Sequence, residues 1–178
     1  MKTDLRYLLK EFHQLPKTGQ DSLIKDLYNF SNETKLMITN RLVGKADFTD
    51  LIRKMRRETI DKIYRKGEPG MIDGRKINTI ISSAKKARAD YEVVTQLEWL
   101  AFRGFTEFLH EFGGGPYNYD IAGPRHLYEY LTLVKKYKSS VEAAVLFKEA
   151  EHYIRSKNNM NQDYNFDALE EATGIRVR

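Results

Sequence analysis

The 178-residue chain contains no cysteine and only four prolines. The lack of cysteine excludes disulfides, thiolate zinc sites and cysteine nucleophiles. No run of about 18 consecutive apolar residues occurs, so we expect no membrane span. The opening segment MKTDLRYLLKEFHQLPK carries Asp4 and Glu11, which interrupt its apolar residues, and we do not expect a signal peptide. Together these absences predict a cytoplasmic protein.

Catalytic motifs are also lacking. The sequence contains no Gly-x-Ser-x-Gly elbow, and the glycines at 113–115 are typical of a helix end. Residues 70–76 have the wrong glycine spacing for a phosphate-binding loop and lack its Gly-Lys-Ser/Thr ending. Arg75 and Lys76 could still hold an anion at the start of the next helix. We therefore assign no catalytic, metal-binding or cofactor-binding residue, and we expect a protein that is not an enzyme and carries no cofactor.

The residues that are present predict an all-α fold. Apolar residues make up 41% of the chain and include 9 Phe, 11 Tyr and 1 Trp, which is enough to build a core. Apolar residues recur at helical spacing nearly throughout, and no stretch alternates as a strand would. The predicted helices cover residues 3–14, 21–30, 36–43, 47–66, 73–90, 92–112, 125–138, 140–157 and 166–173. We expect about eight or nine helices packed as antiparallel hairpins, in a bundle or a short repeat-like stack.

The domain prediction is a single helical domain over 1–178. Its short N-terminal helices, in 1–45, are expected to pack on a helical core at 46–157, with 158–178 as a tail that carries a short helix. Several residues mark helix ends. Thr3 is the expected N-cap of the first helix, Gly123-Pro124 is expected to open the helix after the loop at 117–120, and Ser139 with Glu142 forms a capping box; Gly67 is the expected stop of the helix at 47–66.

Four segments carry a resemblance to a known family. They are Asp4-Leu5-Arg6-Tyr7-Leu8-Leu9; Leu27-Tyr28-Asn29-Phe30-Ser31 with Lys35 and Arg41-Leu42; Ile80 to Ala87, with its Ala84-Lys85-Lys86-Ala87; and Glu107-Phe108 to Glu111-Phe112-Gly113. In these segments the chain resembles a bacterial family of small, helical, cytosolic proteins that is defined by a conserved domain of unknown function. The resemblance covers about the first two-thirds of the chain. It implies a helical, bacterial, intracellular protein and assigns no activity or residue role.

A di-metal carboxylate site is the sharpest catalytic candidate. Such sites in four-helix bundles use two Glu-x-x-His pairs and further glutamates. The chain contains Glu107-x-x-His110 and Glu149-x-x-His152; the additional carboxylates are Glu129 and either Glu58 or Glu92. Projection at 100° per residue places both pairs away from the apolar stripe of their helices. Because a metal site in a bundle must face inward, we expect solvent-facing pairs and no metal site.

The strongest functional pointer is the basic segment 41–90. It carries 14 Lys/Arg against 7 Asp/Glu, whereas the whole chain has a net charge of only +5. Its helices place their basic residues opposite the apolar stripe, and the candidate anion-binding surface comprises Arg53, Arg56, Arg57, Lys76, Lys85 and Lys86. Pairing within the helix is expected between Asp50 and Lys54, Lys54 and Glu58, and Arg57 and Asp61. The interpretation that we favour is a solvated face, or one docked against the acidic residues 91–178.

The last candidate is a tyrosine cluster. Tyrosine is common at interfaces because it combines a large apolar ring with a polar tip. The candidate partner surface consists of Tyr117, Tyr119, Tyr128 and Tyr130. The alternative is a loop held to the domain by its own aromatic side chains. We predict a helical protein–protein interaction module that binds an unknown protein partner and no membrane; the alternative is a basic module that binds RNA or DNA through residues 53–88.

Overall fold

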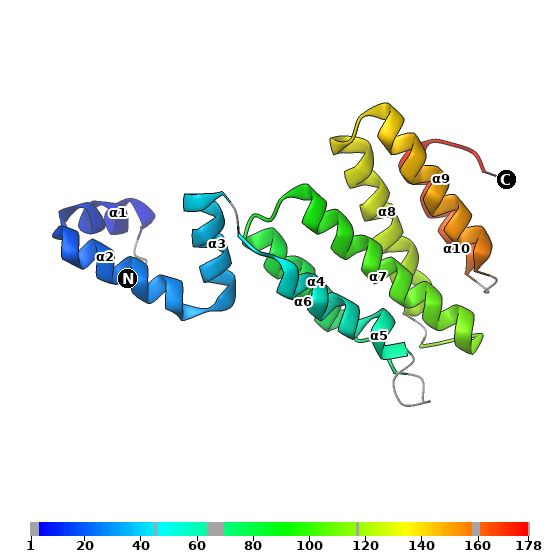
Figure 1. Cartoon of the computed structure of the whole chain (residues 1–178), viewed down its shortest axis with the longest axis horizontal. Helices are drawn as coiled ribbons and strands as arrows, with labels where there is room; N and C mark the ends of the chain where they lie inside the picture. Colours follow the sequence, from blue (N-terminus) through cyan, green and yellow to red (C-terminus); the bar gives the residue numbers. More distant parts are fainter. Residues whose placement is uncertain (1–3, 45, 64–69, 117, 158–160, 178) are drawn as a thin grey trace. The chain divides into compact units, whose positions relative to one another are not determined.

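The structure is a computed structural model and describes residues 4–44, 46–63, 70–116, 118–157 and 161–177. Within these ranges the chain forms helices joined by turns and loops and contains no strand (Figure 1). The all-α fold class predicted from the sequence is therefore confirmed.

The chain divides into two compact units. One unit comprises Met1–Ala46 with Lys86–Arg88, and the other comprises Asp47–Lys85 with Ala89–Arg178. The division at residue 46 coincides with the point where the sequence pattern separates the short N-terminal helices from the predicted core. That residues 1–45 pack on that core as part of one domain stays a prediction.

The N-terminal unit contains α1 (Leu5–Gln14), α2 (Lys17–Phe30) and α3 (Asn32–Val43). Asp4 caps α1 by accepting a hydrogen bond from the Arg6 N–H, whereas the predicted cap Thr3 lies outside the described residues. No residue of these three helices is buried, and large apolar side chains such as Phe30, at 81% exposure, face solvent. Short helices without a shared core are marginal in water, so this unit carries little stability of its own.

The larger unit contains the remaining helices: α4 (Thr49–Glu58), α5 (Ile60–Ile63), α6 (Gly74–Lys86), α7 (Tyr91–Phe112), α8 (Tyr119–Tyr137), α9 (Ser140–Ser156) and α10 (Gln162–Thr173). α7 is the central helix and contacts α4, α5 and α8 (Figure 1). α8, α9 and α10 all contact one another. The consecutive helices α7 and α8, α8 and α9, and α9 and α10 thus pack side by side, as the predicted antiparallel hairpins require.

The core of the larger unit extends into the predicted tail. Side chains from α7, α8, α9 and α10 form one buried cluster that includes Phe102, Leu131, Ile154 and Leu169. The sequence pattern predicts a short helix at 166–173, and the structure extends it to Gln162–Thr173. Residues 161–177 are therefore an integral part of the core, because Phe166 and Leu169 on α10 are buried against α8 and α9.

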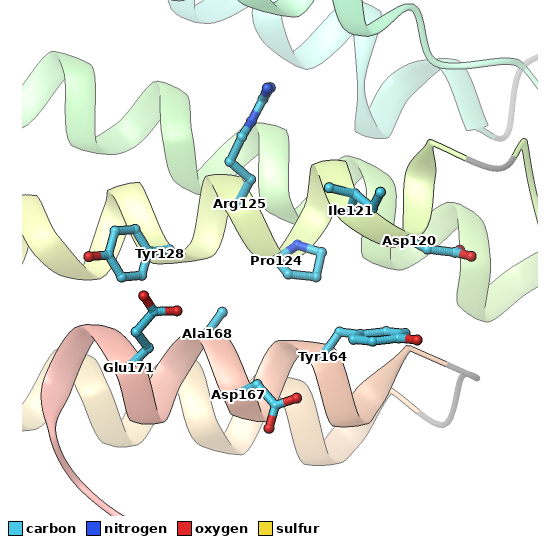
Figure 2. A pocket seen from close by; sticks show the side chains of 9 residues that line it. All are labelled: Asp120, Ile121, Pro124, Arg125, Tyr128, Tyr164, Asp167, Ala168 and Glu171. Atoms are coloured by element: carbon cyan, nitrogen blue, oxygen red, sulfur yellow. The ribbon is translucent and has the colours of Figure 1, made fainter.

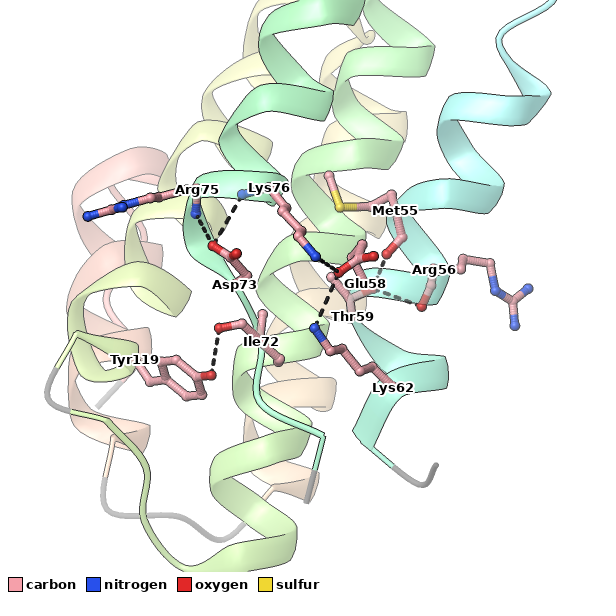
Figure 3. Close-up of polar contacts among 10 residues, drawn as sticks. All are labelled: Met55, Arg56, Glu58, Thr59, Lys62, Ile72, Asp73, Arg75, Lys76 and Tyr119. Atoms are coloured by element: carbon pink, nitrogen blue, oxygen red, sulfur yellow. Dashed lines mark hydrogen bonds and ion pairs between the residues drawn. The ribbon is translucent and has the colours of Figure 1, made fainter. Parts of the chain in front are cut away.

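The single helix predicted over 47–66 is interrupted. It breaks at Thr59, whose backbone (φ −117°, ψ −102°) is not helical, and residues 64–66 and the predicted stop Gly67 lie outside the described residues. Thr59 is fully buried against α7 at Gly104, where an added Cβ would lie 2.6 Å from the Thr59 Cβ. The Thr59 hydroxyl donates to the Met55 carbonyl oxygen at 2.7 Å and satisfies one group that the break leaves open (Figure 3).

Other boundaries also differ from the prediction. α2 and α3 begin at Lys17 and Asn32, ahead of the predicted residues 21 and 36. α8 begins at Tyr119, so Pro124 lies inside the helix rather than at its first position. α6 ends at Lys86, before the predicted residue 90, and Arg88 follows with a positive φ of 57°. The capping box is confirmed: the Ser139 hydroxyl accepts from the Glu142 N–H, and the Glu142 carboxylate accepts from the Ser139 N–H.

Candidate functional site

The described tyrosines of the predicted partner surface, Tyr119, Tyr128 and Tyr130, do not form one exposed surface. Tyr119 is buried, donates its hydroxyl to the Ile72 carbonyl oxygen at 2.7 Å (Figure 3), and packs edge-on against Phe105. Tyr130 is also buried, with its ring 4.8 Å from that of Trp99, and burial raises its pKa to about 12. Tyr117 lies outside the described residues. Helix 119–137 begins earlier than predicted; Tyr119 is buried in the core, whereas the half-buried Tyr128 lines an open groove.

That groove runs between α8 and α10 and has a volume of about 560 Å³ (Figure 2). Each helix contributes one stripe of residues at positions i, i+3, i+4 and i+7, which share a helix face. The stripes are Ile121, Pro124, Arg125 and Tyr128 on α8, and Tyr164, Asp167, Ala168 and Glu171 on α10, with Asp120 at one end. Two parallel stripes of this kind line a trough about as long as two helical turns.

The trough is apolar along its length and acidic at its edges. Two large side chains of the trough are exposed: Ile121 at 62% and Tyr164 at 57%. Three carboxylates line the trough: Asp120, Asp167 and Glu171. The cation among the described lining residues, Arg125, points away from α10 (Figure 2) and donates to the Asn78 side-chain oxygen at 3.1 Å.

The α10 side of this groove was not predicted from the sequence, because residues 158–178 were interpreted as a tail. The residue spacing of this segment indicates a stripe on one helix face. Tyr164, Asp167, Ala168 and Glu171 repeat the spacing of Ile121, Pro124, Arg125 and Tyr128. What the spacing could not supply is that the two stripes lie opposite each other, because this depends on how α8 and α10 pack.

Most of the predicted anion-binding residues are paired with carboxylates. The distance from the side-chain nitrogen to the carboxylate oxygen is 2.7 Å for Arg53 and Asp50 and 3.8 Å for Arg56 and Asp61. It is 3.8 Å for Lys76 and Glu58 and 3.1 Å for Lys85 and Glu98. Of these partners, only Glu98 belongs to the acidic segment 91–178. Arg57 and Lys86 are exposed, and neither forms an ion pair with a described residue.

The ion pairs predicted within the helix are wrong, because the acidic residues pair with other basic residues. Asp50 pairs with Arg53 instead of Lys54, and Asp61 pairs with Arg56 instead of Arg57. The physical reason for the second change is the break at Thr59, which alters the register between the two sides of the helix. Glu58 pairs with Lys62 and Lys76 (Figure 3). In the same view Arg56 points away from that cluster.

A buried acid–imidazole pair lies between α7 and α8. Glu98 is 2% exposed, and its carboxylate is 2.6 Å from the Nδ1 of the buried His126 and 3.1 Å from the Nζ of Lys85. Burial raises the pKa of the Glu98 carboxyl, but the hydrogen bond from His126 and the charges of His126 and Lys85 outweigh it and hold the pKa below its usual value. The sequence analysis missed this pair, because it joins residues 28 positions apart.

The two Glu-x-x-His pairs do not form a site, and one expectation about them is wrong. Glu107 is buried and faces α9, where its carboxylate accepts hydrogen bonds of 2.8 Å from the Tyr153 hydroxyl and the Lys157 ammonium group. Glu149 and His152 are exposed on α9. No group of three or more potential metal-binding side chains comes together within the part of the chain that the structure describes.

Three comparisons were made with known proteins: the chain matches no family model, no curated protein and no solved structure. The resemblance of its sequence pattern to a bacterial family therefore stays a prediction. Among the described helices, none is both long and apolar enough to cross a membrane.

Proposed function

We propose that this protein is a non-enzymatic interaction module that binds a basic, amphipathic helix of a partner protein in the groove between α8 and α10. The observation that carries the proposal is the pair of facing stripes, whose apolar centre is open and whose edges are acidic. Recognition of a helix in a groove uses anchors at i, i+3, i+4 and i+7, which is the spacing that both walls of this groove present.

The apolar centre supports a partner with large hydrophobic anchors. Ile121 and Tyr164 are each more than half exposed, and covering such a side chain contributes about 1.5–3 kcal/mol. Ala168, next to Pro124 in Figure 2, has a small side chain, which leaves room for an anchor to enter from the partner. Tyr128 supplies a further ring at the other end of the groove, which keeps one of the tyrosines predicted from the sequence in the site.

The acidic edges support a basic partner. Asp120, Asp167 and Glu171 line the groove, while the Arg125 guanidinium is turned toward Asn78. Complementary charge at the rim of an interface selects partners and increases association rates more than it increases affinity. The Lys and Arg side chains of the partner helix would therefore lie over α10 and the start of α8.

A library of short amphipathic helical peptides, selected on the full chain, tests this proposal. We expect the selected peptides to combine apolar anchors at helical spacing with lysine or arginine. Ile121→Glu should weaken their binding by about tenfold or more, because it places a charge in the apolar centre of the groove. The matched control is Val141→Glu, at an exposed apolar residue of α9 outside the groove, which should leave binding unchanged.

A charge-reversal variant provides a second test of the groove. Glu171→Lys should weaken binding of the basic peptides and make the remaining affinity less sensitive to salt. The proposal is overturned if no peptide is enriched, if the enriched peptides are acidic, or if Val141→Glu weakens binding as much as Ile121→Glu.

The nucleic-acid alternative rests on the exposed Lys54 and Arg57 of α4, which form no ion pair with a described residue. It predicts a gel shift of mixed RNA or DNA at low salt that disappears as salt rises. Arg56→Glu together with Arg57→Glu should abolish that shift. A shift of this kind, with no selection of peptides, would favour the alternative over the groove.

A further inference from the structure

We propose that a second cavity, beside the starts of α6 and α8, binds a phosphate-bearing small molecule. The cavity has a volume of about 710 Å³, in the range of small-molecule sites. Its walls come from α5, α6, α8 and the segments that precede α6 and α8; all of them belong to the larger unit. The proposal does not rest on the groove between α8 and α10.

Among the described residues, three cationic side chains line this cavity: Lys62 from α5, Arg75 from α6 and Arg125 from α8. Asp73 is the carboxylate that the described part of the lining contains. Lysine and arginine together are the usual protein ligands of phosphate, with arginine supplying a planar fork of N–H donors and lysine a point charge. Lys62 is already paired with Glu58 at 3.3 Å, so the excess of positive charge comes from Arg75 and Arg125, and it favours an anion with several oxygen atoms.

Asp73 does not cancel this charge, because its carboxylate already has partners in the backbone. Its Oδ1 accepts hydrogen bonds from the N–H groups of Arg75 at 2.9 Å and Lys76 at 3.4 Å (Figure 3). The Arg75 side chain extends away from Asp73 in the same view and forms no ion pair with a described residue. Arg75 is thus the cation in the cavity that is free to meet a ligand.

Arg125 is held in place before any ligand arrives. Its Nη2 donates to the Asn78 Oδ1 at 3.1 Å and lies 3.3 Å from the Nε2 of His126. The other ring nitrogen of His126 is fixed by the buried carboxylate of Glu98 at 2.6 Å. A guanidinium fixed in this way loses little conformational entropy on binding, which is the advantage of a preorganised site.

The rest of the lining suits the remainder of such a molecule. Met71, Ile72, Pro116, Ile121 and Ala122 form an apolar wall. The hydrogen bond from Tyr119 to the Ile72 carbonyl oxygen ties the segment before α6 to α8 and fixes the two sides of the cavity. The sequence analysis noted Arg75 beside a possible anion position; the structure adds Lys62 and Arg125, which come from distant parts of the chain.

Titration of the full-length protein with inorganic pyrophosphate, followed by calorimetry and by thermal unfolding, tests the proposal. We expect saturable binding that weakens with salt and an increase in the unfolding temperature. Arg75→Ala should weaken binding by about tenfold or more, because it removes a cation that makes no other ion pair. The matched control is Arg57→Ala, an exposed arginine of α4 outside the cavity, which should bind pyrophosphate as the unmodified protein does.

A second variant and a second probe sharpen the outcome. Arg125→Gln should also weaken pyrophosphate binding, and its circular dichroism shows whether the helices are retained. A mixed-sequence single-stranded RNA serves as the other probe, because its phosphates are not confined to one cavity. The proposal is overturned if pyrophosphate does not saturate in the millimolar range, if Arg57→Ala weakens binding as much as Arg75→Ala, or if only the RNA binds.

Discussion

Glu98 and Glu107 are two buried carboxylates of α7, and each is stabilised by donors from other helices. Burial raises the pKa of Glu107, but hydrogen bonds from Lys157 and Tyr153 and the charges of Lys157 and Arg103 outweigh it and lower the pKa. The same contact and burial raise the pKa of the Tyr153 hydroxyl. Loss of the charge of such a buried carboxylate is strongly destabilising, because its hydrogen-bond donors are left without their partner.

Glu107→Gln tests this at the residue scale. Hydrogen bonds to charged groups contribute about 1.5–3 kcal/mol, so we expect the free energy of unfolding at neutral pH to fall by roughly this amount. The pKa of Glu107 is lower in the folded state, so its contribution is present above the unfolded value of 4.5 and is lost as the pH falls through the folded value. The difference between the two proteins should therefore shrink below pH 4.5.

Urea denaturation at neutral and acidic pH measures this difference. The control is Glu129→Gln, an exposed residue of α8, which should change stability little at either pH. A Glu107→Gln protein as stable as the unmodified chain at neutral pH would contradict the structural role of the carboxylate.

At the scale of the helices, the segment between α4 and α5 closely approaches α7 where Thr59 meets Gly104. The break between α4 and α5 places Thr59 directly against α7, with the Thr59 Cα only 3.2 Å from the position of an added Cβ at Gly104. Backbone this close cannot be moved by a change of rotamer. Glycine at position 104 is therefore required by the packing of α7, although glycine is a poor residue inside a helix.

Gly104→Ala sets two effects of opposite sign against each other. Alanine is favoured over glycine inside a helix by about 1 kcal/mol, whereas overpacking costs about 1–3 kcal/mol. We expect the steric cost to win, because the contact is 2.6 Å from Cβ to Cβ. Thermal unfolding should show a lower midpoint for Gly104→Ala and little change for Gly114→Ala, where an added Cβ meets nothing within 4 Å. Equal midpoints for the two variants would contradict this packing.

At the scale of the whole molecule, the two units differ in how they are stabilised. α1, α2 and α3 contain no buried residue, whereas α7 alone buries twelve, including Phe102 and Phe105. Burial of apolar side chains is the main favourable contribution to folding. The larger unit therefore has the core that folding requires, and the N-terminal unit presents apolar side chains such as Leu5 and Phe30 to its surroundings.

Removal of residues 1–46 tests this difference. We expect the remaining chain to keep its helical circular dichroism per residue and to unfold in one cooperative transition, because its core is complete. A peptide of residues 1–46 alone should show little helix in water. A shortened protein that loses cooperative unfolding would show that the first 46 residues contribute to the core.

Much of the fold follows from local pattern. The helical class, the capping box at Ser139 and the approximate positions of most helices are set by neighbours in the chain, and these predictions agree with the structure. The predictions are wrong where the local structure involves a residue that is distant in the sequence. The helix breaks at Thr59, which packs against Gly104, and the ring of Tyr119 is buried against α7. Half of the candidate groove and two of the three cations in the second cavity escaped prediction for the same reason.

The sequence by itself determined that the chain is helical, that it lacks cysteine, and that its basic charge is concentrated between residues 41 and 90. Only the tertiary structure decided which groups these basic residues meet. Lys85 pairs with the buried Glu98, Lys76 pairs with Glu58, and Arg75 lines an open cavity. Helical periodicity is a property of residues three or four positions apart, whereas an ion pair or a groove depends on side chains that only packing brings together.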